Sequence, residues 1–183
     1  MEKNLSRTEW REAATGGLYA GLAYALLTIA AHAGRSMPGL VTILNAVSFF
    51  SFAGFLYFYA RRMAAYAGGD GFSYGRSLLF VLKMSLFAGV LAGVGQFVLV
   101  NWIDPEGFRE QFDLMVANMA GGGMGEKEAE MAGSLGLKLM RNPLFAVFSG
   151  IFSMLIYGGL LGLLISIFVR RPADPFGGGT SAE

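Results

Sequence analysis

Four long apolar blocks dominate the pattern along the chain, and the polar residues gather between them. The blocks cover about residues 13–33, 40–60, 78–103 and 144–169. Each is about 20 residues or longer, which is the length that an α-helix needs to cross the hydrocarbon core of a bilayer. The runs are continuous rather than alternating, which favours helices over the strands of a closed barrel. The pattern therefore predicts an all-α membrane protein with four transmembrane helices, in a single domain covering residues 1–171.

The first apolar block has a rival interpretation as a secretory signal peptide. Basic residues precede it, and residues 31–33 resemble a small-residue cleavage site. However, its apolar stretch of about 20 residues exceeds the 7–15 that are typical of signal peptides. Glu9 and Glu12 also interrupt the positive region in front of it. We therefore expect the first block to be a membrane span.

The distribution of Lys and Arg predicts the orientation of the spans, because cytoplasmic flanks are enriched in these residues. The two terminal flanks and the loop between the second and third spans hold Lys3, Arg7, Arg11, Arg61, Arg62, Arg76, Arg170 and Arg171. Segment 104–143 instead holds four basic and seven acidic residues. We therefore expect both termini in the cytoplasm and segment 104–143 outside. The glycine-rich tail, residues 172–183, is predicted to be disordered and cytoplasmic.

Segment 104–143 has the pattern of a helical hairpin. Asp104-Pro105-Glu106 resembles a helix start, with a capping carboxylate followed by proline at the first helical position. An apolar stripe then recurs at helical spacing in Phe108, Phe112, Met115 and Met119. A second helix is predicted from Glu126 to Met140, with Met131, Leu135 and Leu139 on one face. The stripe of the first helix either packs on its partner helix and the span ends, or forms an interaction surface.

Three polar side chains within the predicted spans are candidates for function. Lys83 lies about five residues, roughly 8 Å, from the cytoplasmic end of the third span, so its side chain can reach the membrane surface. An ionisable residue inside a span is nevertheless a functional candidate. Asn45 and Gln96 lie at similar depths in the outer leaflet, in the second and third spans. They predict either an interhelical hydrogen bond or a polar ligand pocket.

Composition removes several classes of function. The net charge is +1, so no strong field favours nucleic acid. There is no cysteine and a single histidine, His32, so we expect no metal site or cofactor. No cluster of acids and histidines suited to catalysis lies in the predicted spans, so we expect a protein that is not an enzyme. His32 is expected to be a membrane-interface residue.

Glycines recur at a spacing of four in three of the spans, in the pairs Gly17/Gly21, Gly89/Gly93 and Gly158/Gly162. This spacing permits close approach between helices. We expect these pairs to pack within the chain first, and to form a homodimer surface second.

The layout resembles the DUF4199 family, a group of uncharacterised bacterial membrane proteins with four predicted spans. The resemblance is carried by Tyr74-Gly75, Ile103-Asp104-Pro105-Glu106, the helix start at residues 124–128, Pro143 and Arg170-Arg171. It covers nearly the whole chain. The resemblance implies a bacterial inner membrane location, and it brings no known activity or catalytic residue.

The function expected from these observations is that of a structural or interaction protein. Its partners would be membrane lipid, another membrane protein or a second copy of the chain, and the candidate interaction surface is the stripe Phe108, Phe112, Met115 and Met119. The alternative is a small transporter or channel subunit that acts as an oligomer. In that case Asn45, Gln96 and Lys83 would line the path.

Overall fold

The computed structural model describes residues 2–68 and 71–172, with side chains described from Leu5 onward. The predicted disordered tail lies, apart from Pro172, outside the described residues. The helical elements are α1 (Glu2–Ala33), α2 (Pro38–Ala67), α3 (Tyr74–Val98), the π-helix η2 (Leu99–Ile103), α4 (Pro105–Gly121), α5 (Glu126–Met140) and α6 (Pro143–Val169).

Four of these helical segments are long and apolar enough to cross a membrane: Leu5–Ala33, Pro38–Ala67, Tyr74–Ile103 and Pro143–Val169. Apart from short connecting turns and loops and one isolated β-bridge, the described residues are helical. The predicted class, an all-α protein with four membrane-spanning helices, is therefore confirmed, and the chain is a multi-pass membrane protein.

The helices extend beyond the predicted spans at several ends. α1 begins at Glu2 rather than near residue 13, and α2 continues to Ala67 rather than ending near residue 60. The predicted spans followed the apolar blocks, whereas the helices continue through the polar residues beyond those blocks. In α1 these polar residues are held by side chains of α2 and α3, as described below.

Side chains cap three of the helices, and one of them is the cap predicted at Asp104. The Ser73 hydroxyl accepts a hydrogen bond from the Arg76 N–H at 3.4 Å, at the start of α3. Asn142 accepts from the Leu144 N–H at 2.9 Å, in front of the proline that begins α6. Asp104 caps α4 in the same way. These caps satisfy backbone donors that a helix start leaves without a partner.

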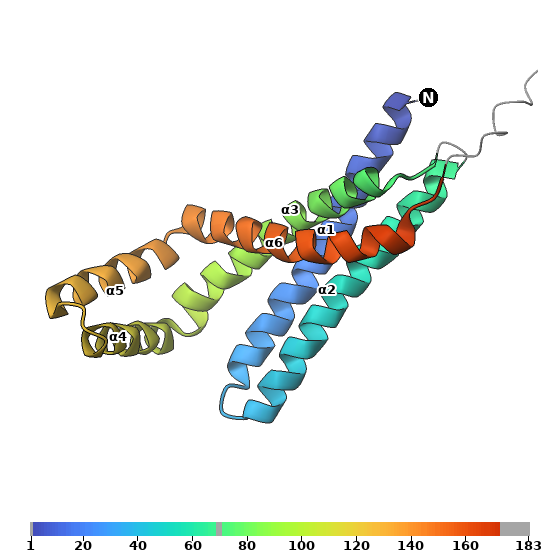
Figure 1. Ribbon diagram of the computed structural model, residues 1–183. Helices are drawn as coiled ribbons and strands as arrows, with labels where there is room; N and C mark the ends of the chain where they lie inside the picture. The colour runs from blue at the N-terminus through green and yellow to red at the C-terminus, as the bar shows by residue number, and fades with distance from the viewer. Residues whose placement is uncertain (1, 69–70, 173–183) are drawn as a thin grey trace, which may run out of the picture.

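Each of the four spanning helices packs against at least two of the others. The most extensive packing joins α3 to α6, followed by α1 with α3 and α1 with α2, and a smaller contact joins α2 to α6. α1 and α2 run side by side as an antiparallel pair, and the α4–α5 hairpin continues from the far ends of α3 and α6 (Figure 1). The start of α1 and the end of α6 lie at the opposite end, which we call the N-terminal end. The other end is called the hairpin end.

Glycines line the closest contacts between these helices. Gly17 and Gly21 of α1 face the backbone of α3 at Met84 and Ala88, so closely that an added methyl group would collide with it. In the seam between α3 and α6, Gly89 and Gly93 face the backbone of residues 146–151. The glycine pairs thus pack within the chain, as the first of the two interpretations expected.

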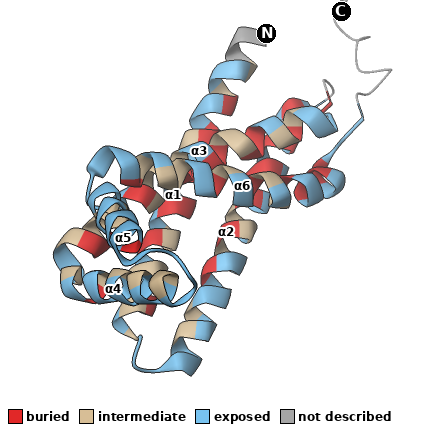
Figure 2. Ribbon diagram, turned by 60° about the vertical axis from the view of Figure 1, so that its left-hand side comes forward, coloured by how far each residue is buried: buried red, intermediate tan, exposed pale blue. Residues whose placement is uncertain are grey.

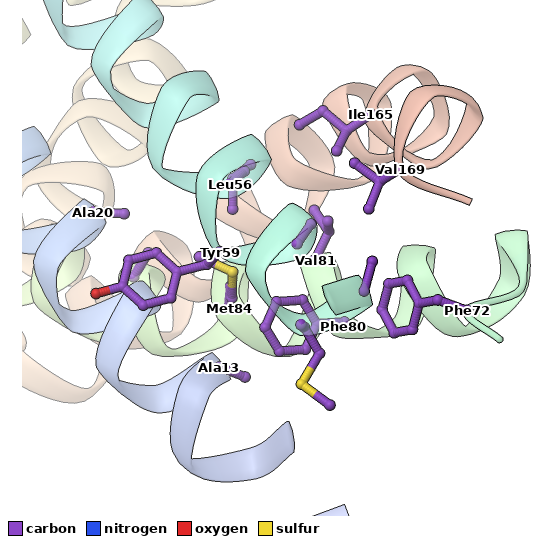
Figure 3. Close-up of a cluster of buried hydrophobic side chains, with 14 of the residues drawn as sticks. Ala13, Ala20, Leu56, Tyr59, Phe72, Phe80, Val81, Met84, Ile165 and Val169 are labelled. Atoms are coloured by element: carbon purple, nitrogen blue, oxygen red, sulfur yellow. The ribbon is translucent and has the colours of Figure 1, made fainter. Parts of the chain in front are cut away.

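The core lies where α1, α2, α3 and α6 meet towards the N-terminal end. Figure 2 shows buried residues concentrated on these helices, and Figure 3 shows side chains from all four converging. Its largest fully buried apolar members include Leu56, Met63, Phe72, Phe80 and Met84. An isolated pair of backbone hydrogen bonds, each 2.9 Å, joins Phe72 to Arg171 and so ties the loop before α3 to the end of α6.

Candidate functional site

The junction between α3 and α4 is built by a π-helical turn. The Asp104 N–H donates to the Leu99 carbonyl oxygen at 3.0 Å, which closes a wider turn than an α-helix would. One oxygen of the Asp104 carboxylate, Oδ1, then accepts from the Gly107 N–H at 3.0 Å and starts α4. The other oxygen, Oδ2, remains available for residues outside this segment.

That second oxygen binds two side chains from the end of α1 and the turn that follows it. The His32 Nε2 lies 2.7 Å from Asp104 Oδ2, and the Arg35 guanidinium donates to the same oxygen. The His32 ring also stacks on Phe108 of α4, with 5.4 Å between ring centroids. We call His32, Arg35 and Asp104 the hinge cluster, because they fix the start of the hairpin to α1.

The hinge cluster keeps Asp104 ionised. The hydrogen bond from His32 lowers the pKa of the Asp104 carboxyl below its ordinary value of 3.8. The Gly107 N–H and Arg35 act in the same direction, while burial opposes them. Because the pKa is lower in the folded chain than in the unfolded one, the contact contributes its full stability above pH 3.8. That contribution is lost as the pH falls through the lowered, folded-state pKa.

Replacing Gly107 by alanine is expected to release the hairpin from the bundle. A β-carbon at this position would lie 2.7 Å from the Asp104 carboxyl carbon and would also collide with the Arg35 guanidinium. Such overpacking costs about 1–3 kcal/mol. At about 1.4 kcal/mol per tenfold change in the opening equilibrium, trypsin should then cut the hairpin at Arg109 or Lys127 about 5-fold faster or more. Gly121→Ala is the control, because nothing lies within 4 Å of its added carbon, and equal cleavage of both variants would contradict the expectation.

Asn45 and Gln96 line one open groove of about 570 Å³ beside the hinge cluster. The other residues lining it are Thr28, Ala31, His32, Arg35, Pro38, Val41, Thr42, Leu99, Phe108 and Gln111. No hydrogen bond joins the two amides to each other in the described part of the chain. Both amides therefore line the same groove and form no direct interhelical hydrogen bond with each other.

Lys83 lies at the N-terminal end, in a cluster of charges on α1. Its Nζ is 2.5 Å from Glu9 Oε1 and 4.8 Å from the centroid of the Trp10 ring. The Arg76 Nε lies 3.3 Å from the other oxygen of Glu9. One turn further, Glu12 is 3.5 Å from Arg62 of α2. We call these residues the α1 charge cluster.

Both acids of the α1 charge cluster are buried, with 6% of each residue exposed. The predicted first span began near residue 13, whereas Glu9 and Glu12 lie inside the helical segment that is long enough to cross the membrane. A signal for this was present in the sequence. The two acids are three residues apart and continue the same helical face as Ala13 and Ala20, which are fully buried.

The predicted stripe of α4 is divided between different environments. Phe108 stacks on His32, and the ring of Phe112 packs on α5 at Gly136. Met119 is half-buried, whereas Met115 is 48% exposed. Of the four stripe residues, Met115 is therefore the one that is available for contact with another molecule.

The second hairpin helix exposes the face that its sequence predicted. Met131, Leu135 and Leu139 are 59%, 59% and 46% exposed, and we call them the α5 apolar face. The opposite side of α5 is buried against α4 through Ala129 and Gly133. In the described residues, no three His, Cys, Asp or Glu side chains converge in a way that could hold a metal ion.

Comparison with known sequences gives one family match. The model of a family described as "Protein of unknown function (DUF4199)" matches residues 15–171, which is most of the chain. No curated protein and no solved structure matches.

Proposed function

The chain belongs to the DUF4199 family, and from that premise we propose that it is a structural or interaction protein of a bacterial inner membrane. It binds a partner membrane protein through the α5 apolar face. The family itself carries no described activity, so the proposal is argued from the contacts of this chain. We also propose that its termini lie in the cytoplasm and its hairpin outside. The distribution of Lys and Arg supports this orientation.

The observation that carries the proposal is the exposure of the α5 apolar face. Its three large side chains lie outside the spanning segments, each about half exposed, on a helix with a second, buried face. The hairpin is fixed to α1 by the hinge cluster. An apolar face held in a fixed position outside the membrane spans is typical of a binding surface.

The interior supports a role in binding rather than in transport or catalysis. The hinge cluster and the α1 charge cluster lie at opposite ends of α1. Between them the interface of α1 with α2 and α3 is filled by buried apolar side chains such as Ala20, Phe52, Leu56, Met84 and Ala88. The acids at the N-terminal end are paired with cations. We therefore propose a protein that is not an enzyme.

The experiment that tests the proposal is recovery of partners from native membranes in mild detergent. The tagged wild-type chain is compared with Leu135→Asp, which places a charge in the α5 apolar face. Leu114→Asp is the control, since Leu114 is 65% exposed on α4 of the same hairpin. We expect a stoichiometric membrane protein with the wild type and with the control, and a loss of about tenfold or more with Leu135→Asp, equivalent to about 1.4 kcal/mol.

Three results would count against this surface. Recovery of no partner, or an equal loss in both variants, would exclude the α5 apolar face as the binding surface. Recovery of only a second copy of the chain would replace the partner protein by a homo-oligomer. Phe108→Asp and Phe112→Asp are unsuitable here, because both rings pack within the chain and their loss would disturb the hairpin itself.

The alternative is a small transporter or channel subunit, and one observation favours it. Asn45 and Gln96 line a common groove at the hairpin end, where a polar solute could be bound. Lys83, the third candidate for such a path, lies at the other end and is paired with Glu9. Solute flux into vesicles containing the wild type, and its loss in Asn45→Ala with Gln96→Ala, would favour transport over the binding role.

A further inference from the structure

Three cations gather where the hairpin joins the bundle. Arg109 on α4 and Arg141, directly after α5, line one groove of about 600 Å³ between the two helices. Lys138 and Arg141 line an adjoining hollow of about 510 Å³ that reaches Asn142 and Pro143. The two hollows share Ser134, Leu137 and Arg141, and we call them together the root groove.

The cations of the root groove have no carboxylate partner. In the described part of the chain, no Asp or Glu oxygen lies within 4.0 Å of the charged nitrogens of Arg109, Lys138 or Arg141, although ion pairs hold the cations of both clusters described above. Asp113 and Glu130 line the same groove on the side towards the hairpin tip. The root of the groove is therefore positive and its far part negative, which suits a ligand whose negative charge lies at the root.

The cations lie next to two span ends in the sequence, which favours a membrane lipid as the ligand. Arg141 lies two residues before Pro143, where the fourth span begins, and Arg109 lies six residues after Ile103, where the third span ends. The hairpin leaves the bundle at these two span ends (Figure 1). Arg109 and Arg141 thus lie close to two span ends, next to the headgroup region that borders a membrane span.

The chemistry of the lining agrees with a lipid rather than with a free ion. Phe112, Val116 and Leu137 add an apolar wall to the root groove, which suits the glycerol and the first acyl carbons of a phospholipid. A guanidinium group can bind two phosphate oxygens at once. Basic pockets at the ends of membrane helices bind headgroups through the same combination of charge and shape.

We propose that the root groove binds the phosphate of an anionic phospholipid, with Arg109 and Arg141 as the two main contacts and Lys138 beside them. The site is separate from the α5 apolar face, so either proposal can fail alone. A bound lipid would join α4, α5 and the start of α6 at one point and hold the hairpin at a fixed height above the bilayer.

The test is native mass spectrometry of the full chain in detergent with an equimolar mixture of phosphatidylglycerol and phosphatidylcholine. The wild type should retain about 5-fold more phosphatidylglycerol than phosphatidylcholine, or a still larger excess. A ratio of about 5-fold corresponds to a difference in binding free energy of about 1 kcal/mol. Arg109→Gln with Arg141→Gln should bring the two lipids to parity. Lys127→Gln, which removes an exposed cation at the tip end of α5, should keep the preference. The preference should weaken as salt is raised, because the contact is ionic.

Several outcomes would overturn the proposal. A wild type without preference would do so, and so would a double glutamine variant that keeps the preference while melting normally in phosphatidylcholine. The double lysine variant, Arg109→Lys with Arg141→Lys, keeps the charge and should retain part of the preference even where the glutamine variant fails to fold. Inorganic phosphate at millimolar concentration should not displace the lipid, and full displacement would assign the groove to a free anion.

Discussion

Replacing Glu9 by glutamine is expected to destabilise the bundle more than any other single loss of charge. The change leaves the Lys83 ammonium and the Arg76 guanidinium beside α1 without the carboxylate that binds both. Breaking a buried ion pair from one side costs about 3–5 kcal/mol. Here the side chains of Lys83 and Arg76 remain 25% and 30% exposed, so we expect about 2–3 kcal/mol after screening by solvent. The loss is measured as the difference in the free energy of unfolding in detergent between the wild type and the Glu9→Gln variant.

The controls separate the ion pair from a general effect of removing charge. Glu110→Gln removes an exposed acid of α4 and should change the free energy of unfolding by no more than about 0.5 kcal/mol. Combining Glu9→Gln with Lys83→Met removes both partners and should cost less than the sum of the two single changes, by about 1 kcal/mol or more. A Glu9→Gln variant as stable as the Glu110→Gln variant would show that the pair does not hold α1 to α3.

Replacing Gly150 by alanine is expected to separate α3 from α6. An added β-carbon would lie 2.5 Å from the Gly93 Cα and N and 2.6 Å from the Gly89 carbonyl oxygen. All three atoms belong to the backbone of α3, so no rotation of a side chain can make room. We expect a loss of about 3 kcal/mol, at the upper end of the usual cost of overpacking, because the most extensive helix contact of the chain must open. Unfolding by SDS, followed by circular dichroism, measures the loss.

Gly54 provides the matched control within a spanning helix. It lies inside α2, and nothing lies within 4 Å of the carbon that alanine would add. Gly54→Ala should leave stability unchanged or raise it by up to about 1 kcal/mol, because alanine favours the helix. Equal effects of the two substitutions would mean that the glycines of the α3–α6 seam are not required for close packing.

The elements that follow local rules were predictable from the sequence. The length of each apolar block identified the spans, and the caps at Ser73, Asp104 and Asn142 follow from the chemistry of helix starts. The spacing of the glycines also predicted close helix contacts, although not which helices they join. These features depend on residues within one or two turns of each other, so no knowledge of the fold is needed.

The contacts of the two clusters were not predictable in the same way. Asp104 binds His32, which is 72 residues away, and Glu9 binds Lys83, which is 74 residues away. No local pattern marks such a pair, because each partner alone has the properties of a residue at the membrane surface. Glu9 and Glu12 were assigned to a flank, since an acid normally ends an apolar block. Helix α1 continues through them because neighbouring helices supply the opposite charges.

The exposed face of the hairpin could not be predicted from helical spacing alone. Helical spacing predicted one apolar stripe through Phe108 and Phe112, but spacing does not say what covers each residue, and Phe108 packs on His32 whereas Phe112 packs on α5. The small side chains of Ala129, Gly133 and Gly136 let α5 approach α4 on that side, which covers Phe112 and leaves the α5 apolar face open. The composition of the second helix therefore decides which apolar residues of the first are free.

The contact between α3 and α6 can form only late in synthesis, because its two helices lie far apart in the sequence. Residues 99–142 separate the two helices, and at about 5–20 residues per second the ribosome needs roughly 2–9 s to make them. During that interval Gly89 and Gly93 have no α6 backbone to pack against, because the helix that covers them in the folded chain does not yet exist. The nascent chain thus presents an open glycine groove to the insertion machinery until α6 arrives.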